Sequence, residues 1–116
     1  MKQIFIYIKT QTEFIHQYKD APEEVSYLRY PHRHIAHVKV KIEVFNNDRD
    51  IEFIMFKHEI EKNLNDLRLN ELTNCSCEQV ANYLLDKIQL SFGINRDVEI
   101  TISEDNENGC ELVYKK

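Results

Sequence analysis

The chain has 116 residues, of which 42% are hydrophobic and only four are glycine or proline, so it can build the core of one domain. This composition excludes disordered, collagen-like and low-complexity proteins. Fifteen Lys and Arg against 20 Asp and Glu give a net charge of −5. An acidic chain argues against nucleic acid or an anionic membrane as a partner, because both favour a basic surface.

The cysteines and the N-terminal residues bear on the cellular compartment. Cys75, Cys77 and Cys110 cannot all pair within the chain, and we interpret them as reduced thiols. The apolar run Ile4–Ile8 is shorter than that of a signal peptide, and no segment approaches the roughly 20 apolar residues that cross a bilayer. We therefore expect a cytoplasmic protein.

The first half of the chain is predicted to form mainly strands. Residues Gln3–Glu13 are rich in β-branched and aromatic side chains and are predicted to form the first strand. The stretch that follows has no clear period, although Asp20–Glu24 combines a proline with acidic residues as in the first turn of a short helix. His32–Val44 alternates apolar and polar residues, which is typical of a long strand with one buried face.

A turn and a further alternating segment come next. Asn46–Arg49 has the residue types of a turn, and in Asp50–Phe56 the residues Ile51, Phe53 and Met55 alternate with their neighbours. We therefore predict that Asp50–Phe56 is a strand that forms a hairpin with the strand before it.

The second half contains two helical patterns. Apolar residues recur at helical spacing through Lys57–Leu72, which predicts a helix. A second helix is predicted to begin at Ser76, where Ser-Cys-Glu-Gln fits a capping box in which we assign Glu78 to the third helical position, and to end at Gly93.

The last predicted strand is Asp97–Ser103, and Leu112–Tyr114 is a candidate for a short further piece. The predicted order is strand, strand, strand, helix, helix, strand. This order indicates a single α+β domain over residues 1–116, in which two helices cover one face of a four-stranded antiparallel sheet.

Histidines provide the clearest chemical signal. His32 and His34 are two residues apart on a predicted strand and therefore project to the same face, close enough to share a metal ion. His16 is the candidate for a third ligand, and three imidazoles leave one position of a zinc ion open to polarise a substrate. His37 projects to the opposite face and His58 begins a helix, so both suit the site less well. The alternative is that these histidines are hydrogen-bonded core residues.

Two other groups are candidates for ligand binding or catalysis. Glu104 ends the last long strand, where a carboxylate can accept two parallel N–H bonds from a flat, nitrogen-rich ring. The alternative is a solvated loop residue, because other acidic residues surround it. We interpret Cys75 and Cys77 as inert thiols rather than as a soft-metal site or a nucleophile.

Taken together, these positions resemble the 6-pyruvoyltetrahydropterin synthase and 6-carboxytetrahydropterin synthase family of the tunnelling fold. The likeness runs through most of the chain, in the family's order. The similar segments are Phe14-Ile15-His16, His32-Arg33-His34, Ile51–Phe56, Leu69-Asn70, Cys75-Ser76-Cys77-Glu78-Gln79 and Glu104.

The resemblance implies a homo-oligomer that forms a β-barrel by edge pairing, with active sites between subunits. It implies zinc on His16, His32 and His34, and a pterin- or purine-like ring held by Glu104. It also makes Ser76 a candidate for binding the ligand.

The chain departs from the family at the positions that carry its catalysis. The family's nucleophilic Cys falls at Leu28, which can supply no base, and its Asp-His pair falls at Asn65-Asp66. Asp66 and His37 are the first candidates for a substitute acid or base, and Tyr27 and Tyr30 are further ones.

Three functions follow from these observations. The first is a zinc-dependent lyase or hydrolase with a non-standard acid and base set. The second is a catalytically inactive binding protein that sequesters a nucleotide-like molecule or regulates a partner. The third is a purely structural α+β module.

Overall fold

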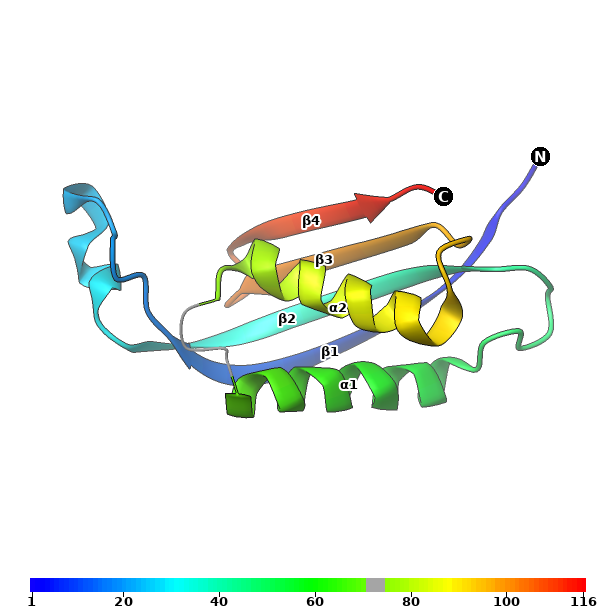
Figure 1. Cartoon of the computed structure of the whole chain (residues 1–116), viewed down its shortest axis with the longest axis horizontal. Helices are drawn as coiled ribbons and strands as arrows, with labels where there is room; N and C mark the ends of the chain where they lie inside the picture. The colour runs from blue at the N-terminus through cyan, green and yellow to red at the C-terminus, as the bar shows by residue number, and fades with distance from the viewer. Residues whose placement is uncertain (71–74) are drawn as a thin grey trace.

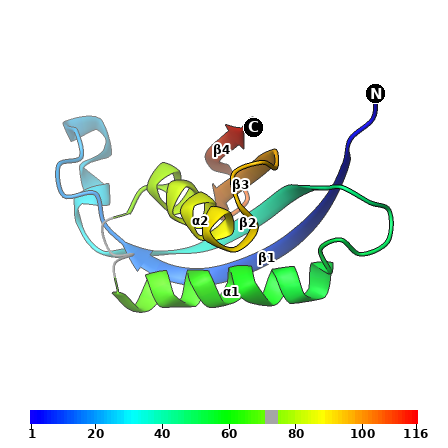
Figure 2. The same cartoon turned by 45° about the vertical axis from the view of Figure 1, so that its right-hand side comes forward.

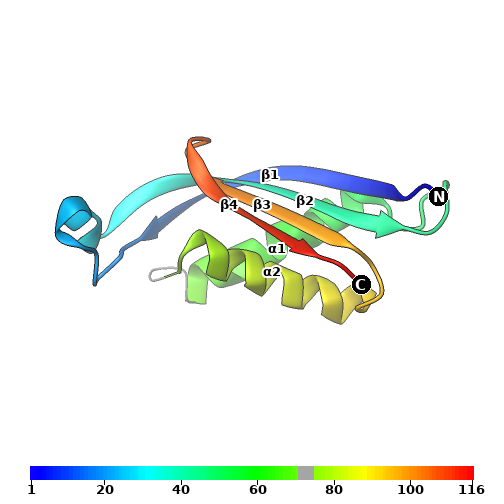
Figure 3. The ribbon, with the colours of Figure 1, turned by 90° about the horizontal axis from the view of Figure 1, so that it is seen from above.

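The chain folds into one antiparallel sheet with two helices on one of its faces (Figures 1 and 3). This computed structural model describes residues 1–70 and 75–116, with the backbone alone for residues 69 and 70. The elements are β1 (Ile4–His16), the 3₁₀ segment η1 (Glu23–Arg29), β2 (His32–Val44), α1 (Phe53–Asn70), α2 (Cys77–Phe92), β3 (Val98–Glu104) and β4 (Asn108–Tyr114). The strand order in the sheet is β1-β2-β3-β4, so the predicted α+β class is confirmed.

The two longest strands, β1 and β2, form a hairpin whose register runs from the pair Ile4 and Val44 to the pair His16 and His32. The prediction of a strand over His32–Val44 is confirmed, and its alternate apolar residues face the helices. The first strand is longer than predicted, because it continues beyond Glu13 to His16. The chain between β1 and β2 carries η1, which projects beyond the end of the sheet (Figures 1 and 2).

The prediction that Asp50–Phe56 is a strand was wrong. Phe53 begins α1, where the backbone N–H of Met55 donates to the side chain of Glu52 and satisfies one of the free donors of the first turn. Phe53 and Met55 are 55% and 72% exposed, whereas Phe56 is 1% exposed. Phe56 therefore starts the helical stripe, and β1 takes the place of the expected hairpin partner of β2.

The end of α1 was predicted at Leu72, which lies outside the described residues. The predicted start of α2 is confirmed: Ser76 caps the helix and forms a capping box, but its partner is Gln79 rather than Glu78. Gly93 ends the helix with a φ of 84°, a conformation that glycine adopts without strain. Glu78 thus has no part in the capping box.

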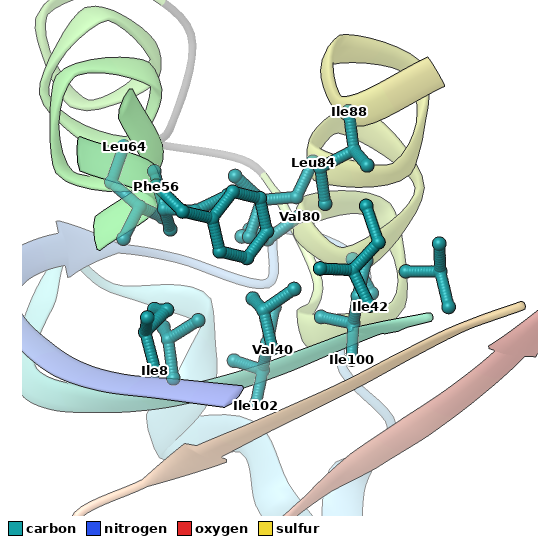
Figure 4. Close-up of a cluster of buried hydrophobic side chains, with 14 of the residues drawn as sticks. Ile8, Val40, Ile42, Phe56, Leu64, Val80, Leu84, Ile88, Ile100 and Ile102 are labelled. Carbon is teal, nitrogen blue, oxygen red and sulfur yellow. The ribbon is translucent and has the colours of Figure 1, made fainter. Parts of the chain in front are cut away.

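The core lies between the helices and the sheet (Figure 4). Its most deeply buried side chains come from both helices and from β2 and β3, and include Val40, Ile42, Phe56, Ile60, Leu84 and Ile100. Each such side chain contributes about 1.5–3 kcal/mol by leaving water, which fixes the helices against the sheet. None of the described helices combines the length and apolar character needed to span a membrane.

Candidate metal centre

Three histidines meet at the end of the β1–β2 hairpin. His16 lies directly opposite His32, and His34 lies opposite Phe14, so all three histidines share the face that the helices cover. Their ring centroids are 4.5 Å apart for His16 and His32, 4.8 Å for His32 and His34, and 5.0 Å for His16 and His34. One nitrogen from each ring lies within 4.8 Å of the other two. The structure thus brings together the three residues selected from the sequence, which we call the histidine cluster.

Each ring of the histidine cluster is held by an oxygen atom at Nδ1. Carbonyl and carboxylate oxygens can only accept, so each Nδ1 carries a hydrogen, and the neutral form of each ring then has its lone pair on Nε2. This arrangement is typical of metal-binding histidines, whose second nitrogen is held by an oxygen acceptor. The contacts are His16 with the Cys75 carbonyl at 3.3 Å, His32 with the Tyr30 carbonyl at 2.8 Å, and His34 with Asp105 Oδ2 at 2.6 Å.

Two of the free nitrogens are buried without a partner. Nε2 of His16 and Nε2 of His34 make no hydrogen bond with any of the described residues. Burial lowers the pKa of His16 below its ordinary value, which favours the neutral ring with its lone pair available. A buried polar atom left unpaired costs about 1–3 kcal/mol, so these two atoms indicate a missing partner.

Glu104 faces the histidine cluster from the end of β3. Its Oε1 lies 3.4 Å from Nε2 of His16, and its Oε2 lies 3.4 Å from Nε2 of His34. The thiol of Cys77 approaches Oε1 at 3.9 Å. With its side chain 28% exposed, Glu104 is turned toward the cluster and is not a fully solvated loop residue.

Asp105 is part of the site, and sequence analysis missed it as a functional residue. Its Oδ2 accepts from His34 Nδ1, and its Oδ1 accepts from the backbone N–H of Ile35 at 2.9 Å. These two hydrogen bonds, that from Ile35 first, lower the pKa of Asp105 and keep it ionised. Asp105 and Asn106 have φ values of 54° and 63°, in the left-handed region that Asp and Asn tolerate best. The turn-forming pair after a strand was the available signal, but it does not reveal which strand the carboxylate reaches.

A cavity of about 660 Å³ opens beside the cluster. This volume lies in the range of small-molecule sites. The cavity is bounded by the ends of β1 and β2, the segment before η1, the start of α2 and the β3–β4 turn. Its lining residues are His16, Gln17, Tyr18, Leu28, His32, Cys75, Ser76, Cys77, Glu78, Gln79, Glu104, Asn108 and Gly109.

The cavity contains some of the predicted site residues and lacks others. Ser76 and Glu104 line it, and the Ser76 hydroxyl accepts from the N–H of Gln79 while keeping its own hydrogen to donate. Asp66 and His37 are not among the described residues that line the cavity. Asp66 is exposed on α1, and His37 projects to the other face of the sheet, as predicted.

Of the positions that the resemblance links to catalysis, some line the cavity and others do not. Leu28 lines the cavity, so an apolar side chain stands there, whereas Tyr27 and Tyr30 are exposed and outside the described lining. The side chains of Leu69 and Asn70 lie outside the described residues. None of the three cysteines forms a disulfide, and burial together with the charge of Glu104 raises the pKa of Cys77 to about 12. Its thiol therefore stays protonated at neutral pH, in keeping with an inert thiol.

Comparisons with known proteins add no family to this geometry. No family model matches the chain, and no match was found among the curated proteins. The functional interpretation therefore depends on the histidine cluster, its oxygen partners and the adjoining cavity.

Proposed function

We propose that this chain is a zinc-binding protein similar to the 6-pyruvoyltetrahydropterin synthase family, with a pterin- or purine-like ligand in the adjoining cavity. One observation supports it above the others: an oxygen holds Nδ1 of each of the three rings, one nitrogen from each ring lies within 4.8 Å of the other two, and the buried Nε2 atoms of His16 and His34 have no hydrogen-bond partner among the described residues. A set of three histidines is the donor set of catalytic zinc sites.

The residues present fit a zinc ion. Imidazole nitrogen suits zinc, and the buried Nε2 atoms of His16 and His34 would gain the partner that they lack. The Cys75 and Tyr30 carbonyls and Asp105 would orient the rings and maintain the tautomer that presents Nε2. Bound zinc would polarise an oxygen atom of the ligand.

The cavity suits a flat heterocycle. Glu104 supplies a carboxylate that can accept a pair of N–H bonds from one edge of such a ring, and Ser76 can donate to a ring nitrogen or oxygen. Leu28 offers an apolar surface for the face of the ring. We propose the ring class from the family resemblance, which the size and polarity of the cavity support.

The proposal also covers how copies of the chain assemble and in which compartment the protein acts. β1 and β4 are the edge strands of the sheet, and edge strands carry unpaired backbone groups that favour pairing with another chain. We propose that copies of this chain pair along these edges into the β-barrel of the tunnelling fold. Three cysteines that form no disulfide agree with action in the cytoplasm, where thiols stay reduced.

Two versions of this function differ in turnover. In the first, the chain is a zinc-dependent lyase-type enzyme with a non-standard acid and base set. In the second, it binds the ring without turnover and sequesters a nucleotide-like molecule or regulates a partner. Leu28 favours the second version, because an apolar side chain lines the cavity at the position that the resemblance aligns with the family's nucleophile.

Metal analysis of the purified protein tests the proposal. We expect one zinc per chain, its loss in His34→Ala, and its retention in His58→Ala, which changes an exposed histidine of α1. Zinc at about 1,000 times its dissociation constant should stabilise the fold by about 4 kcal/mol. A wild-type chain that binds no zinc at neutral pH would contradict the proposal.

Small ring compounds test the proposed binding of a pterin- or purine-like ligand. Pterin or guanosine should raise the melting temperature of the zinc-loaded protein, and Glu104→Gln should reduce that rise. Turnover of dihydroneopterin triphosphate that disappears in His32→Ala supports the enzyme, whereas ring binding without turnover supports the binding protein. No shift with either ring would leave a metal site without the proposed ligand class.

A further inference from the structure

We propose that Glu104 is the fourth metal ligand in the ligand-free protein, so that the metal site is closed until a ring ligand displaces the carboxylate. The inference rests on the proposed function, because it takes the three histidines as the other ligands. It assigns Glu104 a role that differs from that of a residue reserved for the ring.

The spacing of the donor atoms supports this role. Both oxygens of Glu104 lie 3.4 Å from a histidine nitrogen, one from His16 and the other from His34. Ligands about 2.0–2.1 Å from a tetrahedral zinc ion lie about 3.3 Å from one another. Each carboxylate oxygen therefore lies at the separation expected between two ligands of one ion, Oε1 with respect to His16 and Oε2 with respect to His34.

The polarity of the contact supports it as well. Because Nδ1 of His16 and of His34 faces an oxygen acceptor, the opposite nitrogen is the one that carries the lone pair when the ring is neutral. Such a lone pair faces a carboxylate oxygen, and two acceptors at this distance repel each other unless a proton or a metal ion lies between them. Neither nitrogen forms a hydrogen bond with a described residue. A metal ion shared by Glu104 and the histidines removes the repulsion and satisfies the buried nitrogens.

The described surroundings of Glu104 provide little else to neutralise its charge. No Lys or Arg of the described residues forms an ion pair with it, and the Cys77 thiol at 3.9 Å is a weak donor. The position at the end of β3, next to the Asp105 turn, fixes the backbone from which the carboxylate reaches the cluster. The charge of the carboxylate thus has the histidine cluster as its main partner.

A carboxylate in this position cannot bind a ring at the same time. Both oxygens are directed to the histidines, whereas a pair of parallel N–H bonds needs both oxygens turned to one edge of the heterocycle. Ring binding through Glu104 must therefore release it from the metal, and the vacated position becomes available to an oxygen of the ligand. Binding of the ring and opening of the metal site are one coupled event.

Cobalt(II), used alone as a spectroscopic substitute for zinc, tests the inference without any ring ligand. We expect wild type to bind one cobalt with a four-coordinate spectrum that does not change when azide is added. Glu104→Gln should bind cobalt about 10- to 100-fold more weakly, and azide should alter its spectrum because the fourth position is open. Glu78→Gln removes another cavity carboxylate and should behave like wild type.

The outcomes separate this inference from the proposed function. Equal cobalt affinity and equal spectra for wild type and Glu104→Gln would overturn the role of Glu104 and leave the three-histidine site intact. An azide-sensitive spectrum of wild type would do the same without relying on a variant. Failure of wild type to bind cobalt or zinc would overturn the proposed function itself.

Discussion

The two ends of the sheet both gather polar side chains, but they differ in how these groups are paired. At the end where the chain termini lie (Figure 1), Glu43 and Asp97 are only 4% and 6% exposed. Each carboxylate oxygen of these two residues accepts a hydrogen bond. We call Gln3, Glu43, Asp97 and Lys116 the terminal cluster. Its donors are the Gln3 amide, the Asp97 backbone N–H, and the backbone N–H and ammonium of Lys116.

The histidine cluster lies at the opposite end of β2 and is incomplete. Two of its ring nitrogens are buried without a partner, and the nearest carboxylate presents acceptors to them. Buried polar groups are normally paired, so the fully paired cluster is explained by stability alone, whereas the unpaired nitrogens point to a partner such as the proposed metal ion. The contrast separates a structural cluster from the proposed functional one within a single sheet.

The largest effect is expected from breaking the terminal cluster. In metal-free protein, Glu43→Gln should lower the melting temperature by about 5 °C or more, because the amide replaces an acceptor and leaves Lys116 without its ionic partner. His32→Ala, which alters the other end of β2, should lower it less. Thermal denaturation followed by circular dichroism measures both. Equal losses would mean that the two clusters contribute alike to stability and would remove the contrast.

A smaller effect should follow from changing the residue that orients His34. Asp105→Asn should weaken zinc binding about 10- to 100-fold, because an amide N–H facing Nδ1 favours the tautomer that protonates Nε2. The amide oxygen can still accept from Ile35, so the metal-free melting temperature should change little. Competition with a fluorescent chelator measures the affinity, and Glu107→Gln is the control in the same turn. Unchanged affinity in Asp105→Asn would show that His34 does not need this partner.

The smallest effect concerns acid stability. Hydrogen bonds lower the pKa of Glu43 below 4.5, with Lys116 the leading cause, and that of Asp97 below 3.8, with Gln3 the leading cause. The unfolded chain then binds more protons at these sites, so their contribution to stability is complete above about pH 4.5 and is lost as the pH falls through the native values. The stability difference between wild type and Glu43→Gln should be constant above pH 5 and narrow below it. Urea denaturation at several pH values measures this stability difference. A difference that widens in acid would contradict the prediction.

The sequence was a good guide wherever a pattern repeated over many residues. The alternation of His32–Val44 predicted a strand, and Ser76 with the apolar stripe behind it predicted α2. Three alternating residues in Asp50–Phe56 were too few, because the same residues also fit a turn followed by the start of a helix. In that segment the outcome was decided by the burial of Phe56, which α1 packs into the core against the sheet, and not by the local pattern.

The candidate site shows the same division. Sequence spacing by itself determined that His32 and His34 share a face, because the side chains of a strand alternate with a period of two. Only the tertiary structure decided that His16 stands opposite His32, that Asp105 holds His34, and that Glu104 faces both free nitrogens. Those contacts depend on strand register and on the direction of a turn. Both are set by how the whole sheet packs against the helices, and neither is encoded in any short segment.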